Sequence, residues 1–365
     1  MDERKTLYNI QILRFIAAAM VVFAHAELGQ YGIGNIEILG VLGGFGVIIF
    51  FIISGFIIPY VAYGGSQSEG EFKISAVIFF MRRVIRIFPV YALITALCVL
   101  SAFIVKHYIS TPTPPISYWW PETKINLQWY IESITFTHWH RNAILSIGWT
   151  LQLEFLFYTA FAFFIAIKLA RLEYLEISFL TISIASNILT HQNSSIVSEI
   201  FPFISTLARP EMVVFAMGMF MYRLYLLGAI LKKSLAITIL TLFIPAFILC
   251  EHFDITTNMG GEWHRPLIWG FFAFYGVWAA LSLEGKIKPA KLLIFLGNAS
   301  YSIYLTHGLI TAWVSYLFVA LGLVNYFNVY LYVVIYFIIS CALGSAIHIY
   351  RKTHCDIFKA FCLTG

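Results

Sequence analysis

The stretch YNIQILRFIAAAMVVFAHAEL, residues 8–28, is apolar almost throughout, yet it contains Arg14 and His25. An α-helix turns by about 100° per residue, so positions eleven residues apart return to nearly the same face. Arg14 and His25 would therefore face the same way, about 16 Å apart along the helix axis. A charged or titratable side chain is costly inside a membrane span, and it usually marks a pathway for protons, ions or polar substrates. The alternative is an arginine that reaches an interface and a histidine satisfied by a neighbour.

The remainder of the chain repeats this apolar pattern. Of the 365 residues, 60% are hydrophobic and 11% are charged, and the mean hydropathy is +0.84. Soluble domains usually carry about a quarter charged residues. We therefore predict an all-α polytopic membrane protein, a single domain over residues 1–365 with a short tail after residue 350. The ten predicted spans lie near residues 9–28, 40–62, 87–106, 147–167, 172–190, 203–222, 233–250, 265–283, 292–318 and 327–349.

The distribution of Lys and Arg between alternate loops predicts the orientation. One set of loops and termini holds seventeen basic residues and the other holds four. Because cytoplasmic loops carry the excess of positive charge, both termini are predicted to be cytoplasmic. The net charge of +5 then reflects loops beside anionic lipid rather than nucleic-acid binding. The five cysteines have no pairing or metal-ligand spacing, so neither disulfides nor a metal site is expected.

Three titratable residues are predicted to reach a similar depth from three different spans. His25 and Glu154 fall in the outer third of their spans, and His307 falls in the outer half of its span. A carboxylate orients an imidazole and keeps it basic, so the three together suit proton abstraction from a hydroxyl. The alternative is three polar groups that are satisfied independently.

A basic pair lies on the predicted cytoplasmic side, in FFMRRVIRIFPVY, residues 79–91. Arg83 and Arg86 are three residues apart and share one face of a short helix that is expected to end before Pro89. Two guanidinium groups at this spacing suit phosphate binding. The alternative is that they only set the topology.

Small residues and a second charged pair complete the polar inventory of the spans. Gly46 and Gly55, with Ser54 beside the second, predict close helix packing, and a ligand chain passing them is the alternative.

Arg209 and Glu211 are two residues apart, so in a helix they would point to different sides. Either residue could contact a substrate, and either could be an interfacial anchor.

The external segment 107–146 is rich in aromatic side chains. It contains Trp119, Trp120, Trp129 and Trp139, together with histidines and Arg141. Aromatic rings beside polar groups suit sugar binding, and an interfacial aromatic belt explains most of the same residues.

Taken in order, these strings resemble the acyltransferase-3 family of integral membrane acyltransferases, which modify extracytoplasmic glycans. The resemblance covers about residues 7–350, and Thr150 stands where the family usually has serine. The matching strings are Arg-x10-His at residues 14–25, GV…FFxxSGF at 46–56, RxxR with Pro-x-Tyr at 83–91, WSLxxExxFY at 149–158, RxE…G at 209–218 and SYSIYLxH at 300–307.

The resemblance implies an acyl-CoA donor, usually acetyl-CoA, that enters from the cytoplasm, and a glycan acceptor on the far side of a bacterial inner membrane. His25 would carry the chemistry, with Glu154 and His307. The implied donor-binding residues are Arg14, Ser54, Arg83 and Arg86, and the implied acceptor-binding residues are Trp149, Arg209, Glu211 and Tyr304.

Two other functions remain open on the sequence. Buried charges at several depths also suit a secondary transporter or flippase, although no repeated halves are visible. A non-catalytic partner in polysaccharide export is the second alternative. Hydrolysis of a CoA thioester by purified protein would favour the enzyme.

Overall fold

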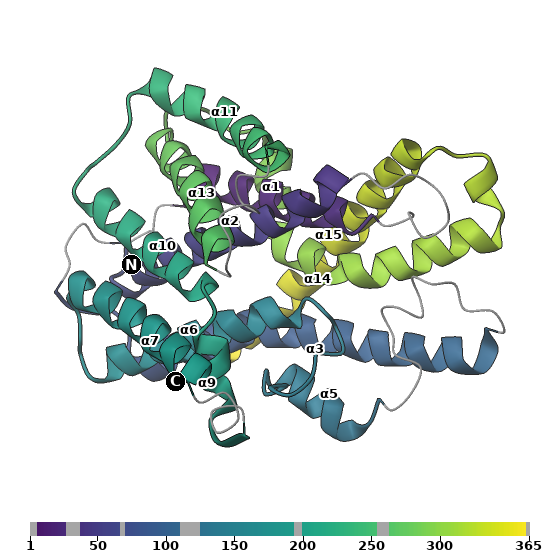
Figure 1. Cartoon of the computed structure of the whole chain (residues 1–365), viewed down its shortest axis with the longest axis horizontal. Coiled ribbons are helices and arrows are strands. Elements are labelled where there is room, and N and C mark those ends of the chain that lie inside the picture. Colours follow the sequence, from purple (N-terminus) through teal and green to yellow (C-terminus); the bar gives the residue numbers. More distant parts are fainter. Residues whose placement is uncertain are drawn as a thin grey trace.

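The fold is entirely helical in the residues that the structure describes. The computed structural model describes residues 6–26, 37–65, 70–109, 125–192, 199–253 and 263–362. The principal helices are α1 (Tyr8–Ala24), α2 (Glu37–Ala62), α3 (Ala76–Tyr108), α5 (Leu127–Ile134), α6 (Gly148–Ala166), α7 (Leu172–Gln192), α9 (Pro202–Leu207), α10 (Glu211–Leu226), α11 (Lys233–His252), α13 (His264–Ser282), α14 (Lys291–Ala320) and α15 (Val329–Cys362) (Figure 1).

Seven of these helices are long and apolar enough to cross a membrane, counted over the described ranges. They correspond to seven of the ten predicted spans, in α2, α3, α6, α7, α11, α14 and α15. Two further predicted spans are the shorter apolar helices Tyr8–Ala24 and Pro266–Ser282. Large apolar side chains on α3 face outward, such as Leu100 and Phe103, which are about half exposed. Such a surface is stable in hydrocarbon rather than in water, so the chain is a polytopic membrane protein.

The remaining predicted span, residues 203–222, is not one helix but two. Helix α9 ends at Leu207 and α10 begins at Glu211, so Arg209 and Pro210 lie in the turn between them. Proline lacks a backbone N–H and disfavours the helical conformation in the residue before it. The break therefore follows from Pro210, and it leaves Arg209 outside both helices.

Pro89 does not end a helix, contrary to the sequence expectation. Helix α3 runs through it from Ala76 to Tyr108. The Arg351 guanidinium donates to the Arg86 carbonyl at 3.1 Å, and the Tyr301 hydroxyl donates to the Ile87 carbonyl at 2.8 Å. These two bonds hold the α3 segment before Pro89 against α15 and α14, and support from neighbouring helices allows a membrane helix to continue past a proline.

Glycines allow the central helices to pack closely. Helix α1 packs against α2 and α14, and α2 also packs against α10. A Cβ at Gly46 would lie 2.5 Å from the Ala17 carbonyl oxygen, and one at Gly55 would lie 2.9 Å from the Gly218 Cα. Any larger residue would force these helices apart, which confirms the packing role predicted for the two glycines of α2.

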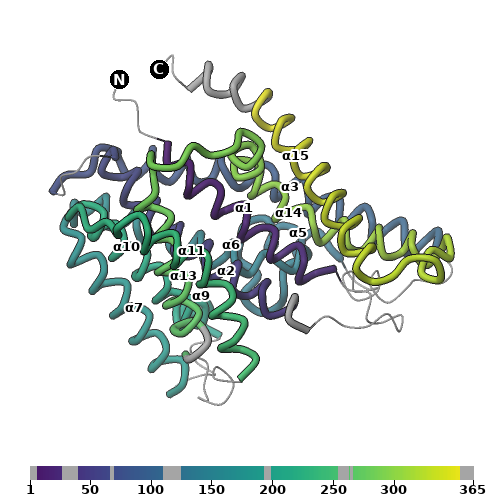
Figure 2. Tube along the Cα trace, turned by 90° about the horizontal axis from the view of Figure 1, so that it is seen from above, coloured from purple at the N-terminus to yellow at the C-terminus, as the bar shows by residue number. Residues whose placement is uncertain are grey.

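The two ends of the described chain share one side of the molecule. In Figure 2 the start of α1 and the last coloured turns of α15 both lie toward the top of the view. This placement agrees with an even number of membrane crossings. The assignment of that side to the cytoplasm stays a prediction from the basic residues.

Candidate functional site

Two cavities lie end to end along one face of α2. The arginine cavity, of about 110 Å³, is lined by residues that include Arg14, Arg83 and Arg86. The tryptophan cavity, of about 680 Å³, is lined by residues that include Trp149 and Trp269. Helix α2 lines the first with its later residues, up to Ile58, and the second with its earlier residues, from Gly40. The helix α2 therefore forms a wall common to both cavities.

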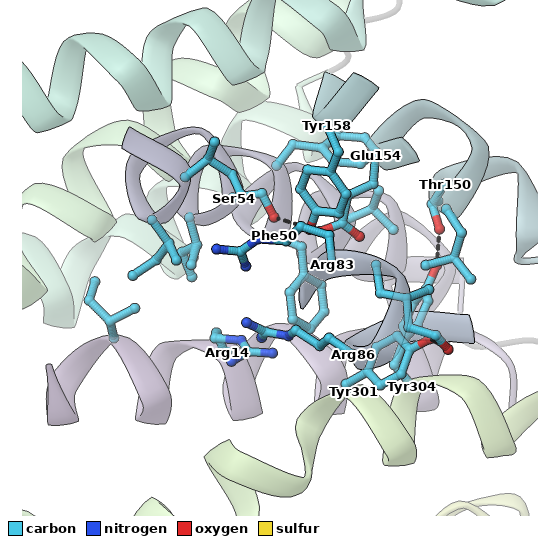
Figure 3. Close-up of a pocket in the computed structure, with 18 of the residues that line it drawn as sticks. Arg14, Phe50, Ser54, Arg83, Arg86, Thr150, Glu154, Tyr158, Tyr301 and Tyr304 are labelled. Carbon is cyan, nitrogen blue, oxygen red and sulfur yellow. Dashed lines mark hydrogen bonds between the residues drawn. The ribbon is translucent and has the colours of Figure 1, made fainter. Parts of the chain in front are cut away.

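The arginine cavity brings together the four residues predicted to bind a donor. Figure 3 shows the guanidinium groups of Arg14, Arg83 and Arg86 facing one space, with the Phe50 ring beside them and Ser54 opposite Arg14. Arg83 is only 5% exposed, although its charge is costly to bury. The neighbouring Arg82 is exposed and does not line the cavity. Of the three arginines at the start of α3, the two that are three residues apart share the cavity.

Aromatic rings support the buried Arg83 guanidinium. Its central carbon lies 5.4 Å from the centre of the Phe79 ring and 5.6 Å from the centre of the Tyr158 ring. Cation–π contacts of this kind stabilise a guanidinium that is removed from water. These two rings therefore help to hold the Arg83 guanidinium at the cavity.

Glu154 lines the arginine cavity, whose lining includes neither His25 nor His307. Its Oε1 accepts hydrogen bonds from the Ser54 hydroxyl, at 3.2 Å, and from the Tyr158 hydroxyl. Of the three residues predicted to act together, the cavity lining therefore contains Glu154 alone. The predicted depth of each residue in the membrane was counted from the end of its span, which assumes that all helices are upright and begin at the same level. Real spans tilt and begin at different levels.

His25 and His307 do lie together. Their ring centres are 4.8 Å apart, and neither ring is among the residues that line the two cavities. The His25 Nδ1 donates to the Val21 carbonyl at 2.8 Å, and the His307 Nδ1 donates to the Tyr304 carbonyl. A carbonyl only accepts, so these contacts place the proton of each neutral ring on Nδ1. Nε2 of each ring then carries the lone pair that a general base needs.

Tyr304 connects the histidine pair to the cavities. Its hydroxyl lies 2.7 Å from the Thr150 hydroxyl, which in turn donates to the Ile147 carbonyl at 2.8 Å. The Tyr304 ring lines the arginine cavity, and its backbone carbonyl binds His307. Thr150 keeps the hydroxyl of the serine that it replaces, and it uses that hydroxyl to join α6 to α14.

The tryptophan cavity holds three of the four residues predicted to bind a substrate. The Arg209 guanidinium lies over the Trp149 ring, 4.4 Å from its centre. The same guanidinium donates from Nε and Nη2 to the two carboxylate oxygens of Glu211, at 3.3 and 3.0 Å. The expectation that Arg209 and Glu211 point apart was wrong, because Arg209 precedes α10 and does not follow helical spacing.

Trp269 forms part of this cavity and was not predicted to bind a substrate. It lies on α13, and its indole N–H donates to Glu251 on α11 at 2.8 Å. A Cβ at Gly44 would lie 2.6 Å from the Trp269 ring, so only a glycine on α2 leaves room for it. No local sequence pattern links these three helices. Their contact follows only from the tertiary packing.

A similar arrangement of Trp, Arg and Glu occurs outside the spans. The Arg141 guanidinium lies 5.4 Å from the centre of the Trp129 ring and donates to Glu132 from Nε at 2.7 Å. These hydrogen bonds from Arg141 lower the pKa of the Glu132 carboxyl. Trp119 and Trp120, which were also considered for sugar contact, lie outside the described residues.

The two cavities offer different binding chemistry. Among the described residues, no group of three or more His, Cys, Asp or Glu side chains is placed to hold a metal ion. The arginine cavity instead offers charge-assisted hydrogen bonds to phosphate, and the tryptophan cavity offers aromatic and polar surface to a hydroxylated ligand.

Comparison with known proteins agrees with the predicted resemblance. The acyltransferase domain family matches residues 7–349 of the chain. Among curated proteins, the exopolysaccharide production protein ExoZ of Rhizobium meliloti (strain 1021) is 27% identical over 291 residues, which cover 77% of this chain and 81% of that protein. No solved structure matches the chain significantly.

Proposed function

Because the chain belongs to the acyltransferase-3 family, we propose that it transfers an acyl group, most simply acetyl, from cytoplasmic acyl-CoA to a hydroxyl of an extracytoplasmic glycan. The observation that carries the proposal is the meeting of two chemically different cavities at one residue of α2, Val47. A donor and an acceptor that arrive from opposite sides of a membrane need two such chambers. The similarity to an exopolysaccharide production protein supports a glycan as the acceptor.

The arginine cavity is proposed to hold the donor. Arg14, Arg83 and Arg86 come from two helices and line a space in which Glu154 is the one carboxylate among the described lining residues. Phosphate oxygens accept charge-assisted hydrogen bonds from guanidinium groups, and a CoA thioester carries several phosphates. Ser54 borders the same cavity and is proposed to contact the donor beside Glu154.

The tryptophan cavity is proposed to hold the acceptor. Trp149 and Trp269 give it aromatic walls, and the paired Arg209 and Glu211 give it polar ones. This mixture suits a sugar, whose ring has apolar faces and a polar edge of hydroxyls. Tyr304, predicted as a further acceptor contact, lines the arginine cavity and is proposed to act at the boundary between donor and acceptor.

His25 is proposed as the general base, with His307 as its partner. The base takes the proton of the acceptor hydroxyl while the hydroxyl oxygen attacks the thioester carbonyl carbon. The bond from that carbon to sulfur then breaks, and the acyl group remains on the sugar oxygen. The CoA thiolate takes the proton from the imidazolium and leaves as the CoA thiol. The Nδ1 hydrogen bonds of both rings support this role, because they leave Nε2 able to accept a proton.

The test uses the purified protein in sealed vesicles of known orientation. Acyl-CoA is supplied on one face and a glycan acceptor on the other, and acylated glycan is measured by mass spectrometry. Transfer is expected only when acyl-CoA is on the face of the chain termini and the acceptor is on the opposite face. Equal acylation of an acceptor offered on the donor face would contradict the arrangement, and thioester-independent glycan exchange would indicate a carrier instead.

A further inference from the structure

Val47 lines both cavities, and it does so from the middle of their common wall. On α2, Gly44 and Ile48 line the tryptophan cavity, and Phe50 and Ser54 line the arginine cavity. On α6, Trp149 lines the tryptophan cavity and Thr150 lines the arginine cavity. The lining therefore changes from one cavity to the other at Val47 on α2 and between Trp149 and Thr150 on α6, and we call this region the junction.

Hydrogen bonds and ring contacts fix the side chains of α6 and α14 near the junction. Thr150 is 5% exposed and uses its hydroxyl to bind both the Ile147 carbonyl and the Tyr304 hydroxyl. The Tyr304 ring packs edge-on against the Phe50 ring, with 5.7 Å between the ring centres. These contacts connect α6 and α14 to α2 around the junction, so the side chains there have little freedom to move when a ligand group passes.

Val47 itself cannot swing aside. Valine is branched at Cβ and in a helix keeps one χ1 rotamer almost exclusively. The backbone beneath it is equally fixed, because a Cβ at Gly46 would already lie 2.5 Å from the Ala17 carbonyl oxygen. Val47 is 8% exposed and lines both cavities, so its side chain is packed where the two linings meet. A group that moves from one cavity to the other along α2 therefore passes the two methyl groups of Val47.

From this geometry we infer that Val47 selects the length of the acyl group that passes from the arginine cavity to the tryptophan cavity. The inference rests on the proposed function, since it assumes that an acyl group crosses this junction. A short acyl group fits past two fixed methyl groups, whereas each added methylene must displace one of them. Apolar sites discriminate by about 10-fold to 200-fold per methylene.

The experiment compares the activity of the purified protein with acetyl-, propionyl-, butyryl- and hexanoyl-CoA, as kcat/KM relative to the acetyl donor. Val47→Ala removes both methyl groups, so we expect the relative value for butyryl-CoA to rise by about tenfold. Val47→Ile adds a methyl group and is expected to lower the relative value for propionyl-CoA. The second variant keeps the test decisive if the first does not fold, because an unchanged profile in Val47→Ile would overturn the inference.

A matched control separates the junction from general loosening of the protein. Val277→Ala makes the same change at a fully buried position of α13 that lines neither cavity. Its acyl-length profile should equal that of the unaltered protein. A shift in Val277→Ala as large as that in Val47→Ala would overturn the inference. Absence of transfer from every donor in the unaltered protein would instead contradict the proposed function, so the two failures are distinguishable.

Discussion

The arginine cavity and the tryptophan cavity share a wall but balance their charges differently. In the first, three guanidinium groups face a lining whose described residues include a single carboxylate, and that carboxylate binds two hydroxyl groups. In the second, the Arg209 guanidinium is bound at both carboxylate oxygens of Glu211. A surplus of positive charge suits a polyanionic ligand, and a balanced pair suits an uncharged one.

The residues proposed to bind the two substrates and the residues proposed to act in catalysis also lie in different places. The histidine pair belongs to neither cavity lining, yet it is joined to the junction through Tyr304. Substitutions should therefore fall into three groups, those that lower the rate, those that weaken donor binding and those that weaken acceptor binding. The following substitutions test that division, in order of decreasing effect.

Removal of His25 should have the largest effect. His25→Ala removes the proposed general base, so kcat should fall by about 100-fold to 10,000-fold while donor affinity is retained. The measurement is acyl transfer under saturating donor and acceptor, together with acyl-CoA binding in detergent. His252→Ala, at an exposed position at the end of α11, serves as the control and should retain activity. Near-normal transfer by a well-folded His25→Ala protein would contradict the role of this histidine.

Removal of the α3 arginines should weaken donor binding alone. Each hydrogen bond to a charged group contributes about 1.5–3 kcal/mol, so Arg86→Ala should lower acyl-CoA affinity by about 10-fold to 100-fold. Arg83→Ala should do the same, although it also leaves a gap beside two aromatic rings. Affinity is measured by calorimetry at several salt concentrations, because charge-assisted binding weakens as salt rises.

Arg82→Ala is the matched control for both arginines. It removes the same charge from the same helix at an exposed position. If Arg82→Ala weakened donor binding as much as Arg86→Ala, the effect would come from the overall field at this membrane face. The cavity would then have no special part in donor recognition.

Removal of the Trp149 ring should weaken acceptor binding by about tenfold. Trp149→Ala takes away both an aromatic wall and the surface on which the Arg209 guanidinium rests. Cation–π contacts contribute about 0.5–2 kcal/mol, and Trp149→Phe should retain part of that contribution. The acceptor KM should rise in the order Phe then Ala, with no change in hydrolysis of acyl-CoA. A change in donor affinity would show that the two cavities are not separate sites.

Some of this arrangement could be predicted from the sequence, because it depends on local spacing. The RxxR interval of α3 and the glycines of α2 each indicate a helix face without knowledge of the fold. Hydropathy located the long spans for the same reason. These features need only the geometry of one helix.

Other features could not be predicted, because they depend on how helices tilt and meet. The arginine cavity is lined by Glu154 and not by His307, and hydropathy does not report which side chains of α6 and α14 reach a common cavity. The Arg209–Glu211 pair required knowledge that a proline turn replaces helical geometry. Trp269 joins the site only because α13 packs on a glycine of α2. Residue spacing within a single segment predicts none of these three features.

The smallest effect concerns the surface counterpart of the tryptophan cavity. Trp129, Arg141 and Glu132 repeat the arrangement of Trp149, Arg209 and Glu211 outside the spans. If these three surface residues also contacted the acceptor, Glu132→Gln would raise the acceptor KM. We expect an unchanged KM and a small loss of stability instead, because ion pairs near the surface contribute little and this one braces the loop before α6.

The pH dependence of stability distinguishes these outcomes. Arg141 holds the pKa of the folded Glu132 carboxyl below its ordinary value of 4.5, so the native state favours the carboxylate. The resulting stabilisation is complete well above pH 4.5 and disappears as the pH falls through the lowered pKa. The thermal midpoint of the unaltered protein in detergent should therefore exceed that of Glu132→Gln at neutral pH, and the difference should vanish in strong acid. A difference that persisted in strong acid would mean that the glutamine disturbs packing, and a raised acceptor KM at neutral pH would extend the acceptor site from the tryptophan cavity onto this loop.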